Sequence, residues 1–168
     1  MGTKTYDHYA YCEQVARTLK AVGHDDQRPR FFTAFGLEDL YNFEDKLSAV
    51  TGMVLIAVDG TEMDSTDNRA DGITDTYTYS IILAKNTQRD RPDTIAQAIR
   101  QCQVAALQVR NLLRLDPDLQ YSLGLEMQLN GIGPIGDGFY GVMLTFTVTD
   151  YPDYTIDEKQ WATVMKSE

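Results

Sequence analysis

Apolar positions recur at helical spacing in two well-separated segments of the chain. The first covers residues 6–22, where Asp7 can cap the start of the helix and Gly23 can end it. The second covers about 92–114, and Pro92 suits its first turn because the missing N–H costs nothing there. Its continuous apolar stripe consists of Ile95, Ile99, Cys102, Ala106, Val109 and Leu113. These patterns predict two amphipathic helices, of which the second is longer.

Between these helices the pattern predicts a shorter helix and one exposed loop. Residues 24–30 form a polar connector, and apolar positions at about 37–47 then predict a short second helix. Residues 60–72 are rich in acidic side chains and contain two glycines, which favours a solvent-exposed loop. A last short helix is expected at 157–165.

Four segments carry the patterns of β-strands. Residues 52–58 are apolar throughout, which predicts a strand covered on both faces. Residues 74–85 alternate between apolar or aromatic and hydroxyl side chains. Residues 121–130 and 139–149 also alternate, and the glycine-rich segment 131–138 between them predicts an antiparallel hairpin.

The expected order of elements is α, α, β, β, α, β, β. This order predicts an α+β fold with a four-stranded, mostly antiparallel sheet made of two hairpins. The long central helix should pack on one face of the sheet, beside the N-terminal helices. We expect a single domain over residues 1–150. Residues 151–168 should form a C-terminal tail that docks on a neighbouring chain or on its own domain.

Composition narrows the functional classes. A chain of 168 residues with 43% hydrophobic residues suits one domain with its own core. Its net charge of −10 makes it a poor general binder of nucleic acid, because phosphate affinity needs clustered Lys and Arg. The start of the chain has no apolar signal segment, and no apolar run could span a bilayer. We therefore expect a soluble, intracellular type of protein with no membrane partner.

Three motifs invite a chemical interpretation. Gly131, Gly133 and Gly136 spell G-x-G-x-x-G, but a dinucleotide loop must open a helix, whereas these glycines lead into a strand. Residues 67–78 resemble a calcium loop, except that Arg69 occupies a liganding position and the twelfth residue is not Glu. We expect a hairpin turn and a solvated loop instead.

The histidines and cysteines are the remaining candidates for catalysis. His8 and Cys12 lie four residues apart on the first helix, and His24 is followed by two aspartates. A zinc site would need two more ligands. Both Cys12 and Cys102 accompany apolar residues, which favours buried thiols. We therefore expect no enzyme activity, no catalytic residues, no metal site and no cofactor, and a small Cys/His enzyme is the third and weakest alternative.

Aromatic and basic side chains are better candidates for protein contacts. Residues 91–120 carry four bases and three acids, and their arginines could form local ion pairs or meet an acidic neighbour. Aromatic residues near the chain ends suit interface anchors, unless both ends fold back on their own domain. The candidate interface residues are Phe31, Phe32, Phe35, Arg100, Arg110, Arg114, Tyr151, Tyr154 and Trp161.

The element order and the final strand carry a family resemblance. An N-terminal helix, a hairpin, a central helix and a second hairpin end in Gly-Phe-Tyr-Gly-Val-Met-Leu-Thr-Phe-Thr-Val at residues 138–148. Over roughly residues 5–150 this organisation resembles phage tail-terminator and related neck proteins (head–tail connector components), including uncharacterised proteins of Bacteroidetes phages. The resemblance carries over no catalytic residues.

The resemblance implies a structural virion protein that forms a homo-oligomeric ring, typically a hexamer. Such a ring would join the tail tube to the neck, and DNA would pass through it without specific binding. The implied location is the tail or neck of the virion, and the host cytoplasm during assembly. The alternative is a non-enzymatic adaptor of a bacterial or prophage system that binds a protein through the aromatic patch at 31–43 or through the hairpin.

Overall fold

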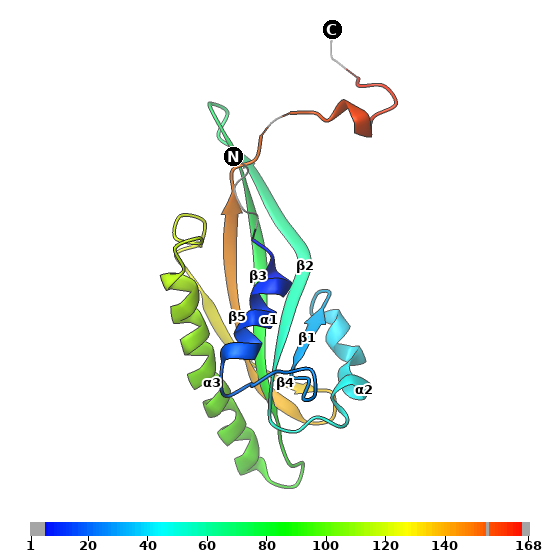
Figure 1. Cartoon of the computed structure of the whole chain (residues 1–168), viewed down its shortest axis with the longest axis vertical. Coiled ribbons are helices and arrows are strands. Elements are labelled where there is room, and N and C mark those ends of the chain that lie inside the picture. Colours follow the sequence, from blue (N-terminus) through cyan, green and yellow to red (C-terminus); the bar gives the residue numbers. More distant parts are fainter. Residues whose placement is uncertain (1–5, 154, 166–168) are drawn as a thin grey trace.

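A five-stranded, mostly antiparallel sheet forms the centre of the molecule. In the computed structural model, which describes residues 6–153 and 155–165, the strand order is β1-β2-β3-β5-β4 (Figure 1). The strands are β1 (Phe31–Ala34), β2 (Met53–Asp67), β3 (Ile73–Asn86), β4 (Gln128–Ile135) and β5 (Phe139–Asp150). Strand β1 runs parallel to β2, and the other neighbours are antiparallel. The predicted α+β class with a long helix is confirmed, but the sheet has five strands rather than four.

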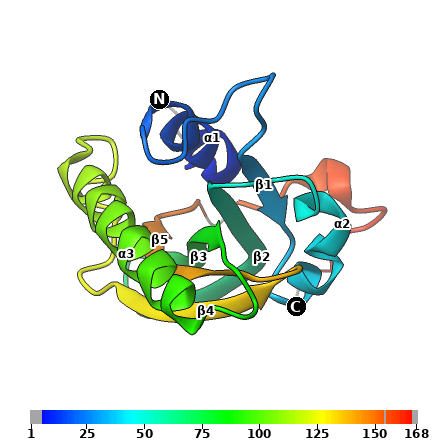
Figure 2. The ribbon, with the colours of Figure 1, turned by 90° about the horizontal axis from the view of Figure 1, so that it is seen from below.

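Helices cover both faces of the lower part of this sheet. Helix α1 (His8–Thr18) and the 24-residue helix α3 (Pro92–Leu115) lie on one face, called here the helix-covered face (Figure 2). The short helices η1 (Glu38–Asn42) and α2 (Phe43–Leu47) lie against the opposite face. A single 3-10 turn, η2 (Glu158–Gln160), stands in place of the helix expected at 157–165. None of the described helices is long and apolar enough to cross a membrane.

Alternating side chains of the strands build two separate cores. Leu55 and Leu83 point to the helix-covered face, where they pack with Cys102 and Val109 of α3. On the opposite face Phe43 of α2 is fully buried among Val54, Ile56, Ile82, Ala84, Ile135 and Phe139. The prediction of a strand covered on both faces at 52–58 is confirmed, because Met53 to Val58 are all buried.

The first hairpin is much longer than the sequence predicted. Strand β2 continues past an irregularity between Val58 and Glu62 and pairs with β3 up to the pair Asp67↔Ile73. The exposed loop predicted at 60–72 is therefore wrong, and only residues 68–72 form the turn. These strands protrude beyond the helices, so neither face of this part of the hairpin has to be apolar. Its polar sequence therefore lacks the pattern that predicts a strand.

The second hairpin starts later than predicted. The strand expected at 121–130 is broken: Leu123 makes an isolated bridge to Val148, and β4 begins only at Gln128. The glycine-rich segment is mostly strand, since β4 runs to Ile135 and the turn occupies 136–138. Strand β5 holds Ser122 and Gly124 through backbone hydrogen bonds, and residues 125–127 then belong to no strand before β4 begins.

The C-terminal segment leaves the sheet at the end of β5. Figure 1 shows it projecting beyond the tip of the molecule. We call residues 151–165 the C-terminal arm; within it Tyr154 lies outside the described residues. Apart from half-buried Val164, every described residue of the arm is exposed, so the arm forms no core with the sheet.

Candidate interaction surfaces

His8 and Cys12 meet inside the helix-covered core. The His8 side chain is only 3% exposed. Its Nε2 lies 2.9 Å from the carbonyl oxygen of Ser80, and its Nδ1 lies 2.9 Å from the hydroxyl of Tyr6. A neutral ring protonated on Nε2 donates to Ser80 and accepts from Tyr6, so one tautomer satisfies both contacts. The Cys12 Sγ lies 3.7 Å from Nδ1.

This pair is not poised for catalysis. Burial lowers the pKa of His8 below its ordinary value of 6.5 and raises the pKa of Cys12 far above its ordinary value. Both groups are therefore neutral near pH 7, and a neutral thiol is a poor nucleophile. The ring of His8 stacks on Tyr79 with 4.6 Å between centroids, as expected for a core residue. No group of three or more metal-ligating side chains occurs in the described part of the chain.

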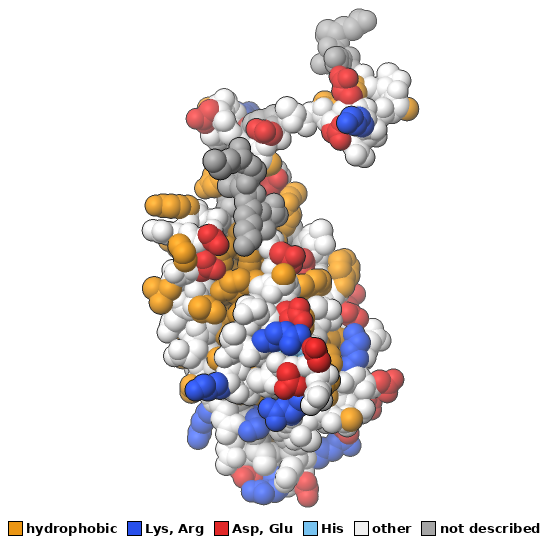
Figure 3. Space-filling model, viewed as in Figure 1, with side chains coloured by type: hydrophobic (Ala, Val, Ile, Leu, Met, Phe, Trp, Pro, Cys, Tyr) orange, Lys and Arg blue, Asp and Glu red, His pale blue; other side chains and the backbone are white. Residues whose placement is uncertain are grey.

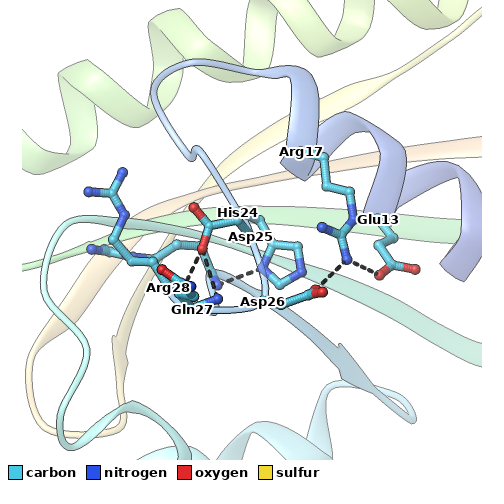
Figure 4. Close-up of polar contacts among 8 residues, drawn as sticks. Glu13, Arg17, His24, Asp25, Asp26, Gln27 and Arg28 are labelled. Carbon is cyan, nitrogen blue, oxygen red and sulfur yellow. Dashed lines mark hydrogen bonds and ion pairs between the residues drawn. The ribbon is translucent and has the colours of Figure 1, made fainter.

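His24 lies in a separate surface loop after α1. Its Nδ1 accepts the backbone N–H of Arg30, while the carboxylate of Asp25 accepts the N–H groups of Gln27 and Arg28 (Figure 4). These bonds stabilise the loop. The two histidines therefore lie in different parts of the structure, His8 in the core and His24 in this loop.

A cavity of about 270 Å³ opens between α1, the α3–β4 connection and β5. Its lining includes four carboxylates and two phenols, those of Asp7, Asp116, Asp118, Asp150, Tyr6 and Tyr11. Among the described residues, the buried hydroxyl of Tyr11 has no hydrogen-bond partner. Such a lining repels phosphate groups.

The outward side of α3 presents basic and apolar side chains to solvent. Arg100, Val104, Leu107 and Arg114 follow one another at spacings of four, three and seven residues, so they share the side turned away from the sheet. Val104 is 67% exposed, and Leu115 at the end of the helix is 81% exposed. We call this surface the α3 outer face. Apolar side chains also gather around the C-terminal end of α3 in the space-filling view (Figure 3).

The arginines of the α3 outer face have no acidic partners in the described part of the chain. The ion pairs in the described part of the chain involve other arginines, namely Arg17, Arg89 and Arg91. Arg114 donates to the backbone oxygen of Leu125, and Arg110 donates to the side chain of Asn111. The local ion pairs considered from the sequence are therefore not formed among these residues.

The protruding hairpin has one polar, uncovered face. Register places Glu62 and Asp64 beside Thr78 and Thr76 on the extension of the opposite face, above the α2 core. Hydroxyl groups pair across β3 and β5, with 3.1 Å between Thr76 and Thr149 and 2.9 Å between Ser80 and Thr145. Residues 59–72 contain five acidic and one basic side chain. This surface, the hairpin polar face, is both hydroxyl-rich and negative.

The candidate interface residues do not form one continuous site. Phe31 and Phe32 are half-buried against the two cores of their own chain, whereas Phe35 is 68% exposed. Tyr151 and Trp161 are exposed on the arm, and Tyr154 lies outside the described residues. Arg100 and Arg114 are exposed and Arg110 is half-buried.

Several exposed apolar residues were missed from the sequence. They are Val104, Leu112, Leu115, Tyr121 and Leu125. The alternation at 121–130 placed Tyr121 and Leu125 on a buried strand face, and only the break in that strand turns them outward. For α3, the sequence did contain a signal, because Val104, Leu112 and Leu115 lie outside the apolar stripe that was predicted to be buried.

No family model matches the chain, and no curated protein matches it.

Proposed function

We propose that this chain is a structural virion protein of a phage, a ring-forming tail terminator or neck subunit that joins the tail tube to the head–tail connector. The observation that carries the proposal is the C-terminal arm. Tyr151, Ile156, Trp161 and Met165 are large apolar side chains, and all four are exposed. A chain that keeps such side chains outside its own core has them available for assembly with other subunits.

The hairpin polar face supports a position beside passing DNA. Carboxylates repeated around a channel repel phosphates, so DNA moves through without being held. The hydroxyl groups of the same face bond to one another across β3 and β5, which leaves them weakly attractive to other ligands. In this proposal the protein resides in the tail or neck of the virion, and in the host cytoplasm during assembly.

The buried state of His8 and Cys12 argues for a non-enzymatic role. Their pKa shifts keep both groups neutral, and the two large side chains next to them, Tyr6 and Tyr79, exclude solvent. The proposal therefore includes no catalytic residue and no cofactor.

The test is the mass of the particle in solution. Light scattering after size-exclusion chromatography should give a discrete oligomer, expected to be a hexamer, either alone or after mixing with the tail-tube protein encoded by the same genome. Negative-stain images of that fraction should show rings. A monomer at all concentrations, with and without the tube protein, would contradict the proposal.

The adaptor alternative has a specific observation in its favour. Phe35, Leu37 and Tyr41 are exposed together in the segment between β1 and α2, and Tyr41 is 89% exposed. An adaptor would use this patch to bind one protein partner as a monomer. Loss of partner binding in Tyr41→Ala, with the chain monomeric throughout, would favour this alternative over a ring subunit.

A further inference from the structure

We infer that the C-terminal arm of one copy of this chain docks on the α3 outer face of a second copy. The inference deepens the proposed function, on which it rests, because it names the contact that would join neighbouring subunits of the ring. Three features of the described residues support it: the apolar character of the arm, complementary charge and matching length.

The arm carries apolar side chains that its own chain leaves uncovered. Trp161 is 56% exposed and Met165 is 91% exposed, although the arm follows directly on β5, an inner strand of the sheet. Exposing large apolar surface to water is unfavourable, so a second surface that covers these side chains lowers the free energy. Within the arm, the carboxylate of Asp157 caps η2 by accepting the N–H of Lys159.

The α3 outer face is the complementary surface. Along one side of the helix two apolar residues, Val104 and Leu107, lie between Arg100 and Arg114. Because α3 already packs its other side on β3 and β5, these residues have no function in the core. A tryptophan can lie on the stem and guanidinium of an arginine, and both residue types dominate protein interfaces.

The charge of the arm is opposite to that of the arginines on the α3 outer face. The arm carries Asp153, Asp157 and Glu158 against one base, Lys159. Arg100 and Arg114 on the α3 outer face lack acidic partners among the described residues, whose ion pairs involve other arginines. Docking would bring these opposite charges together, where contacts to charged groups favour one orientation over the reverse.

The lengths are compatible. A 24-residue helix is about 36 Å long at 1.5 Å per residue. An extended segment of 15 residues reaches about 50 Å. The arm can therefore lie along most of α3 after crossing the gap between two subunits. The arm leaves its own domain at the end of β5, whereas α3 begins at the opposite end of the molecule (Figure 1). A neighbouring copy can therefore offer its α3 outer face without the arm having to turn back along its own domain.

The experiment uses Trp161 as its probe, because it is the only tryptophan of the chain. Its fluorescence should shift to shorter wavelength as the full chain is concentrated, in step with the rise in mass measured by light scattering. Val104→Asp and, separately, Arg100→Glu should raise the concentration at the midpoint of the shift by about tenfold. Combining Arg100→Glu with Glu158→Lys should recover part of that loss.

Matched controls and a deletion distinguish the possible failures. Tyr41→Asp also places a carboxylate at an exposed apolar site, but on η1, and should leave the midpoint unchanged; thermal melts verify that each variant folds. A chain ending at Asp150 should not assemble. If rings form while Trp161 stays solvent-exposed, or form equally well without the arm, the docking inference fails and the ring proposal survives. If the chain stays monomeric throughout, both fail, and a shift independent of concentration would show that the arm folds onto its own domain.

Discussion

His8 shows how a polar side chain can be accommodated in this core without serving catalysis. Its two ring nitrogens have a carbonyl and a hydroxyl as partners, and the flat ring packs between Tyr79 and the Cys12 thiol. The neutral form fits these contacts, and burial disfavours the charged form. The residue therefore links helix α1 to strand β3.

This lowered pKa makes stability depend on pH. In the unfolded chain His8 takes up a proton near its ordinary pKa of 6.5, whereas the folded chain resists protonation to a lower pH. The unfolded state then binds more protons, so stability should fall as pH drops from about 7 towards 5. Burial is the largest effect on this pKa; the hydrogen bond to the Ser80 carbonyl and the carboxylates of Asp59 and Asp7 act in the opposite direction, because they favour the charged ring.

The measurement is the urea midpoint of the full chain and of His8→Gln across this pH range. His8→Gln should be less stable at pH 7.5 and should lose less stability between pH 7 and 5. Equal pH slopes for both proteins would show that His8 does not remain neutral inside the fold.

The two cysteines give a second prediction. Burial raises the pKa of Cys102 to about 12 and that of Cys12 further, and both side chains are buried. A disulfide-exchange reagent at pH 8 should label both thiols at least about a hundredfold more slowly in the folded chain than in urea, because labelling needs local opening. Fast labelling of Cys12 in the folded state would revive the enzyme alternative.

Individual residues were predictable where burial followed the periodic pattern. Cys12, Cys102 and Val109 fall on regular apolar stripes, and all are buried as expected. The prediction was wrong for Tyr121 and Leu125, because their exposure depends on a break in the strand. That break arises from the contacts of residues 122–124 with β5.

At the scale of elements, the sequence pattern predicted only part of the hairpin β2–β3. Its lower part is apolar and was predicted, while its upper part is polar and was predicted as a loop. The upper part of β2 is held by its pairing with β3, which is rich in threonine, and not by the burial of an apolar face. Strand β1 was missed for another reason, since four residues are too few to display a period.

The hairpin polar face predicts how charge affects DNA. The chain should not retain double-stranded DNA at about 0.1 M salt, whereas Glu62→Lys combined with Asp64→Lys should bind DNA with an affinity that falls steeply with salt. A control with the same charge change elsewhere, Glu44→Lys with Asp90→Lys, should bind more weakly. Gel-shift titrations measure both, and equal binding by the two variants would contradict a special position of this face beside DNA.

At the scale of the whole molecule, the general architecture followed from the sequence. The α+β class, the long helix on one face and the antiparallel hairpins are governed by local periodicity and by the burial of apolar stripes. The parallel strand β1 and the projecting arm were not determined in this way. The first depends on a long-range pairing with residues Leu55–Val58, and the second on the absence of contacts within the described chain.

The short length of β1 has a consequence for aggregation. Because β1 covers only the lower part of β2, the outer backbone edge of β2 from Glu62 onward faces solvent. An open edge of this kind invites strands of other molecules to add, and such growth has no natural end. Three acidic side chains along that edge, Glu62, Asp64 and Asp67, make edge-to-edge stacking of identical chains self-repelling. The negative charge of this edge therefore opposes the strand addition that would build fibres.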